Sequence, residues 1–94
     1  MASPAKELMD LFHDLRTAAA KQNDFEAVGV YDSCENMVNN LMHGRAFADI
    51  YPLLRKIFLE NSESNYTSPQ EKEHYITAIM WMDMFAEDKG LTKP

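Results

Sequence analysis

The segment from Tyr75 to Ala86 most restricts how this chain can fold, because almost all of its residues are apolar. It reads YITAIMWMDMFA, in which only Thr77 and Asp83 are polar. A helix that joins a globular core usually has one apolar stripe and a polar face opposite it. Drawn as a helix at about 100° per residue, this segment is apolar on both faces. A chain of 94 residues rarely surrounds one of its own helices completely. The pattern therefore predicts a helix that also contacts a second partner.

The two faces of this predicted helix have different compositions. The first face holds Tyr75, Ala78, Ile79, Met82, Phe85 and Ala86. The second holds Met80, Trp81 and Met84, and methionine is common at adaptable binding surfaces, while tryptophan is enriched in interface hot spots. We expect the first face to join the protein's own core and the second to lie at an oligomer or partner interface. The competing interpretation places the helix inside the bundle, covered by the other helices.

Apolar residues at helical spacing, together with capping signals, predict four helices over residues 4–22, 25–42, 50–60 and 69–89. The strongest signal is Ser68-Pro69-Gln70-Glu71, which combines a capping serine, a proline in the first turn and a glutamate that can bond back to the cap. We also predict Ser3 and Asp24 as caps of the first two helices. Asp49 is the predicted cap of the third, which would place Pro52 in its first turn, where proline is tolerated.

The short connections between these segments predict helical hairpins. Asn23 tolerates the left-handed conformation that ends a helix, and Gly44 supplies the next stop. No segment alternates apolar and polar residues in the way that strands do. We therefore predict an all-α fold, a compact four-helix bundle made of two antiparallel helical hairpins, with residues 1–94 forming a single domain.

The first predicted hairpin resembles one known repeat over part of its length. Lys21-Gln-Asn-Asp24-Phe25-Glu-Ala27, with Tyr31 and Cys34 at the following turns, is similar to the turn and second helix of a tetratricopeptide repeat. The preceding helix does not carry that pattern, because Asp14 stands where an apolar residue belongs, and the second half of the chain does not repeat it. The segment is therefore interpreted as a general tight helical hairpin.

The charge of the chain restricts its partners. Fifteen acidic side chains against nine basic ones give a formal net charge of −6. Nucleic acids and anionic membrane surfaces bind mainly through lysine and arginine, so both are unlikely partners for this chain. The apolar run at residues 75–86 is too short to span a bilayer, and Asp83 interrupts it. With acidic residues where a secretory leader needs an apolar stretch, the sequence predicts a cytoplasmic protein, in the host cell if it is viral.

Residues that could support catalysis or metal binding are few. Cys34, the one cysteine, falls on the apolar side of its helix, where a thiol usually behaves as a small apolar group. Asp10/His13 and Glu71/His74 have the i, i+3 spacing of di-metal bundles, but they fall outside the apolar stripes that would form the interior. The sequence therefore predicts a non-catalytic protein without a metal site or cofactor.

Two charged clusters are candidate binding surfaces. The polar face of the second helix carries four carboxylates that could meet a basic partner: Asp24, Glu26, Asp32 and Glu35. Arg45, Arg55 and Lys56 form the basic cluster in the middle of the chain, and could hold an anion or a nucleotide. In both cases the simpler interpretation is a solvated helix face.

These observations favour a protein that acts by binding. We predict a small acidic protein that binds another macromolecule as an adaptor, inhibitor or regulator, and that acts as a homodimer or higher homo-oligomer through Met80, Trp81 and Met84. Its size and lack of catalytic groups would suit a virus-encoded inhibitor. The alternative is a small-ligand binder that uses Arg45, Arg55 and Lys56.

Overall fold

Four helices make up the computed structural model, which describes residues 3–94. They are α1 (Pro4–Lys21), α2 (Phe25–Met42), α3 (Phe47–Glu63) and α4 (Pro69–Asp88), and no strand occurs between residues 3 and 94. The predicted all-α fold is confirmed. The predicted single domain over residues 1–94 stays a prediction, and residues 1–2 lie outside the described part of the chain.

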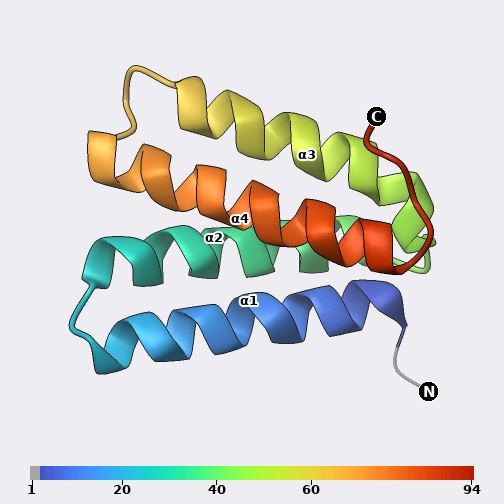
Figure 1. The fold of residues 1–94 in the computed structure, drawn as a ribbon, viewed down its shortest axis with the longest axis horizontal. Helices are drawn as coiled ribbons and strands as arrows, with labels where there is room; N and C mark the ends of the chain where they lie inside the picture. Colours follow the sequence, from blue (N-terminus) through green and yellow to red (C-terminus); the bar gives the residue numbers. More distant parts are fainter. Residues whose placement is uncertain (1–2) are drawn as a thin grey trace.

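The helices form two antiparallel hairpins that pack into one bundle (Figure 1). α1 packs mainly on α2, and α3 mainly on α4, while α2 contacts all three other helices. α4 lies against α3 and α2 and makes only a few contacts with α1. The radius of gyration is 12.7 Å, close to the roughly 12.4 Å expected for a compact domain of this length. Because α4 packs closely on only two helices, one of its faces has no neighbouring helix.

The predicted caps of three helices are present. Ser3 Oγ accepts from Lys6 N at 3.2 Å, and Asp24 Oδ1 accepts from Ala27 N at 3.2 Å. At the start of α4, Ser68 Oγ accepts from Glu71 N at 3.1 Å, while Ser68 N donates to Glu71 Oε1, also at 3.1 Å. These bonds satisfy backbone groups that the first turn of a helix leaves unpaired.

The third helix is longer at both ends than the range of roughly 50–60 predicted for it. α3 begins at Phe47 rather than residue 50 and ends at Glu63 rather than residue 60. Ala46 takes the N-cap position without a side-chain hydrogen bond, so Asp49 lies within the first turn and Pro52 lies inside the helix. The earlier start of α3 is explained by packing. The ring of Phe47 stacks on Tyr51 at 5.5 Å between centroids and meets Phe85 edge-on at 5.2 Å.

The core lies at the centre of the bundle and contains side chains from all four helices. Phe12 of α1 and Phe58 of α3 meet edge to face at 5.8 Å between ring centroids, and both are fully buried. Around them lie further fully buried side chains from every helix: Leu8, Cys34, Val38, Leu54, Ala78 and Met82. This core holds the inner side of α4 in place and thereby fixes which of its residues point outward.

Candidate functional site

α4 has the two distinct faces that its sequence predicts. Its inner face is buried in the core through Tyr75, Ala78, Ile79, Met82 and Ala86. Phe85 is half-buried and packs against the same core. The inner face thus anchors α4 in the bundle, and the outer face is free for other contacts.

Three large apolar side chains lie in one row on the outer face of α4. Ile76, Met80 and Met84 are 59%, 52% and 55% exposed, and their four-residue spacing places them on one side of the helix. We call this row the α4 stripe. Sequence analysis identified Met80 and Met84 but missed Ile76, although the i, i+4, i+8 spacing was available as a signal. Large apolar side chains scattered singly are ordinary on a protein surface, whereas a continuous row indicates a contact surface.

Two grooves border the stripe. The α1–α4 groove has a volume of about 310 Å³ and is lined by Leu11, Trp81, Met84, Phe85 and Asp88. The tail groove, of about 290 Å³, is lined by Ile76, Ile79, Met80, Asp83, Met84, Glu87 and Lys93. Trp81, predicted to lie at the interface, is half-buried in the α1–α4 groove beside Met84. All three stripe residues therefore border the tail groove, and Met84 also borders the α1–α4 groove, a shape that can pack against the side-chain ridges of another helix.

Each end of the stripe carries an exposed glutamate. Glu73 precedes Ile76 by three residues and Glu87 follows Met84 by three, so both carboxylates lie on the same side of α4 as the stripe. Neither forms an ion pair with any residue in the described range 3–94. The outer face of α4 therefore has an apolar centre and two acidic ends.

The four carboxylates of the predicted acidic surface have partners within the chain. Asp32 and Glu35 lie 2.7 Å and 3.4 Å from the guanidinium of Arg16 on α1, although Glu35 Oε2 makes no hydrogen bond. Asp24 caps α2 and lies 3.5 Å from His74 Nε2, and Glu26 accepts a hydrogen bond from Ser68 Oγ at 3.1 Å. These contacts join α2 to its neighbours, while Asp24 and Asp32 stay nearly half exposed and Glu26 is exposed.

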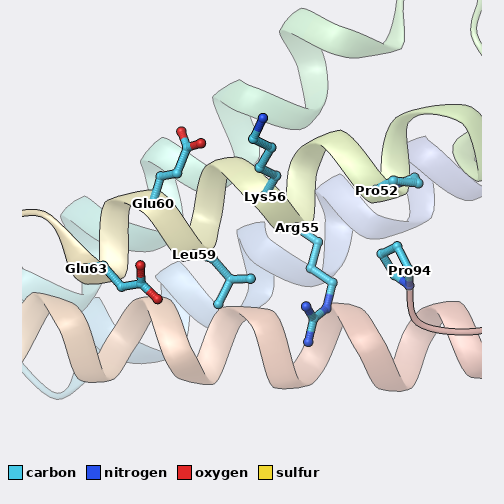
Figure 2. A pocket seen from close by; sticks show the side chains of 7 residues that line it. All are labelled: Pro52, Arg55, Lys56, Leu59, Glu60, Glu63 and Pro94. Atoms are coloured by element: carbon cyan, nitrogen blue, oxygen red, sulfur yellow. The ribbon is translucent and has the colours of Figure 1, made fainter.

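The three residues of the predicted anion site do not all line one hollow. Arg55 and Lys56 line a hollow of about 320 Å³ on α3, and Figure 2 shows Arg55 directed toward α4 while Lys56 points away from it. Arg45 is exposed in the α2–α3 connection and does not line this hollow. Glu60 and Glu63 do line it, and their charges repel an anion.

Arg55 is held by a carboxylate of α4. Its Nε lies 3.0 Å and its NH2 nitrogen 3.2 Å from the two oxygens of Asp83, whose side chain is only 10% exposed. Tyr51 Oη donates to Asp83 Oδ1 at 2.6 Å. Burial and this hydrogen bond raise the pKa of Tyr51 from its ordinary 10.0 to about 12, and the hydrogen bond to Asp83 raises the pKa of Arg55. The network clamps α3 to α4, and the charge of Arg55 is not available to a ligand.

Cys34 and His74, two side chains that could take part in chemistry, are both held in contacts within the bundle. Cys34 is fully buried, and burial raises the pKa of its thiol, which keeps it protonated and unreactive. His74 contacts Asp24 and the ring of Tyr31, whose centroid is 6.0 Å away. Within residues 3–94 there is no cluster of three or more histidine, cysteine or acidic side chains able to hold a metal ion. None of the helices in this described part has an apolar stretch sufficient to cross a bilayer.

Comparison with known proteins adds no further assignment. No family model matches the chain, and neither a curated protein nor a solved structure is similar to it. The site must therefore be interpreted from its own geometry.

Proposed function

We propose that this protein is a non-catalytic binding protein that attaches to another macromolecule through the outer face of α4, as an adaptor, inhibitor or regulator. The observation that supports this function is the α4 stripe, three exposed apolar side chains in a row bordered by two grooves. Fully burying a large apolar side chain contributes about 1.5–3 kcal/mol. Covering the exposed halves of Ile76, Met80 and Met84 would therefore stabilise a complex by several kcal/mol.

The anion-binding alternative has weaker support. Such a site would need at least two cations directed at one point, whereas Arg55 is paired with Asp83 and Lys56 points away from it (Figure 2). The acidic residues Glu60 and Glu63 in the same hollow work further against it. We therefore retain macromolecular binding as the proposed function.

The homodimer predicted through Met80, Trp81 and Met84 stays a prediction, and it would compete with another macromolecule for the same surface. Symmetric self-contact is the commonest form of protein oligomer. We place the function in the cytoplasm, where an unpaired thiol such as that of Cys34 remains reduced.

The proposal is tested by affinity capture with matched variants. Met84→Lys introduces a charge at the C-terminal end of the α4 stripe, and Tyr66→Lys introduces the same charge at a fully exposed residue of the α3–α4 connection. Circular dichroism should show that both variants keep the helical fold. A macromolecule bound by the wild-type protein and by Tyr66→Lys should be lost from Met84→Lys. Equal capture by all three proteins would show that the outer face of α4 is not the binding site.

A further inference from the structure

We propose that the occupant of the α4 stripe is a basic amphipathic helix of another protein, with apolar side chains at helical spacing and lysine or arginine at both ends of its apolar row. This inference rests on the proposed function and names the chemistry of the partner. It is supported by the charges at the ends of the stripe and by the shape of the surface between them.

The outer face of α4 carries one straight row of acidic and apolar side chains. Glu73, Ile76, Met80, Met84 and Glu87 follow one another at intervals of three or four residues, so they lie along one side of the helix. At 1.5 Å per residue, this row extends about 21 Å along the helix axis. An occupant that matches it needs apolar side chains over the central two turns and a positive charge near each end.

Pairing with a second copy would oppose like charges. In an antiparallel contact centred on Met80, Ile76 lies opposite Met84 of the other copy, and Glu73 lies opposite its Glu87. In a parallel contact each glutamate faces its own counterpart. Like charges brought together at an interface weaken association and disfavour that partner. The net charge of −6 adds repulsion between two copies, and the same charge attracts a basic partner.

The nearby lysines do not remove this preference. Lys72 precedes Ile76 by four residues and lies at the same end of the row as Glu73, whereas Asp88 follows Met84 by four residues and adds a carboxylate at the other end. Lys93 lines the tail groove together with Glu87, but forms no ion pair with it. Both ends of the row therefore keep a carboxylate available to a cation of the partner.

The shape of the surface suits a single helix. The tail groove runs along all three stripe residues, and at Met84 the α1–α4 groove lies on the other side. A second helix can place its own side-chain ridges into these grooves, as in the ridges-into-grooves packing of globular proteins. Amphipathic helices are commonly recognised in this way, through anchors at i, i+3, i+4 and i+7.

The experiment uses two synthetic helical peptides without tryptophan that share one leucine stripe. One carries lysines at both ends of the stripe, and the other carries glutamates in the same positions. Trp81 is the only tryptophan of the chain and lies in the α1–α4 groove, so its fluorescence reports binding. The lysine peptide should bind at least about tenfold more tightly than the glutamate peptide, and its binding should weaken as salt is added.

Variants separate local charge from net charge. The double variant Glu73→Lys/Glu87→Lys should reverse the preference and bind the glutamate peptide more tightly. Glu60→Lys/Glu63→Lys changes the net charge equally, on exposed residues of α3, and should still prefer the lysine peptide. Met84→Lys should weaken binding of the lysine peptide about 30-fold, as expected for an interface anchor.

Several results would overturn the inference. These are equal binding of the two peptides, binding of neither, or an equal loss of preference in both double variants. A wild-type dimer in sedimentation that Met84→Lys dissociates would identify a second copy as the occupant. If the peptides fail while macromolecular capture still depends on Met84, the basic helix is excluded and the proposed function stands. If capture does not depend on Met84, the proposed function itself fails.

Discussion

Asp83 is the residue that most directly connects α3 with α4. Its carboxylate accepts hydrogen bonds from Tyr51 Oη at 2.6 Å and from the guanidinium of Arg55 at 3.0 Å and 3.2 Å. A charge this well buried is tolerated only when it is paired and hydrogen-bonded. The polar residue that interrupts the apolar segment 75–86 therefore has a structural role.

The clamp predicts a specific response to alkaline pH. The pKa of Tyr51 is raised to about 12 in the folded protein, against an ordinary 10.0, so the unfolded chain loses this proton first. The stabilisation is complete below about pH 10 and is lost as the pH rises toward about 12. Tyr51→Phe should lower the free energy of unfolding by about 1.5–3 kcal/mol at neutral pH, because a hydrogen bond to a charged group is lost. Urea unfolding at neutral pH would measure this difference.

The same variant should lose less stability than the wild type between neutral pH and about pH 11. Burial also raises the pKa of Tyr31 and Tyr75, so the variant retains part of the alkaline slope. If the free energy of unfolding falls with the same slope in both proteins over this pH range, Tyr51 does not contribute to the alkaline loss of stability.

The identity of this clamp could not be predicted from the sequence. Arg55 was assigned to an anion site because its positive neighbours are visible in the chain, whereas Asp83 lies 28 residues away. Which arginine meets which carboxylate depends on the register between α3 and α4. That register cannot be read from the local patterns of a single sequence. Burial of Met82 and exposure of Met84 follow from helical periodicity, so this part of the site was predictable.

At the level of elements, α3 shows how packing overrides local signals. The periodic apolar pattern and the caps were sufficient to locate α1, α2 and α4 closely. α3 starts earlier than its sequence suggests because Phe47 packs on Tyr51 and Phe85, although Ala46 offers no capping side chain. Aromatic contacts between helices that are distant in the sequence are not visible in local propensities.

The extension of α3 leaves Pro52 inside a helix, where it lacks the N–H that would bond to the carbonyl of Ala48. Pro52 is exposed, so replacing it removes little packing. Pro52→Ala should therefore raise the free energy of unfolding by about 1–3 kcal/mol, measured by urea or thermal denaturation. A lower stability of this variant would show that the proline stabilises the turn into α3 more than it costs the helix.

For the whole molecule, the positions of the charges determine which carboxylates remain available to a partner, and the net charge alone does not. The carboxylates on α2 are used within the chain by Arg16, His74 and Ser68, whereas Glu73 and Glu87 have no ion-pair partner in the described residues. The acidic partner surface predicted at Asp24, Glu26, Asp32 and Glu35 stays a prediction, and the structure adds the contacts that these side chains make within the chain. The pairing of α2 with α1 and α4 is a property of the assembled bundle.

This distribution predicts weak self-association through α4. Sedimentation at tens of micromolar protein and low salt should give the mass of a monomer, because copies paired through the stripe would bring their glutamates together. High salt screens that repulsion and should favour self-association. A stable dimer at low salt that is unaffected by Met84→Lys would indicate a different contact surface.

The start of α1 and the segment that follows α4 meet at one end of the bundle. Pro4 and Leu91 line the same small cavity, and Lys89 Nζ lies 2.8 Å from Glu7 Oε2 (Figure 1). A short linker from Leu91 to Pro4 could therefore join α4 to α1, with new ends opened in the exposed connection around Asn65 and Tyr66. Such a rearranged chain would begin with α4 and continue directly into α1, while the stripe kept its place on the surface.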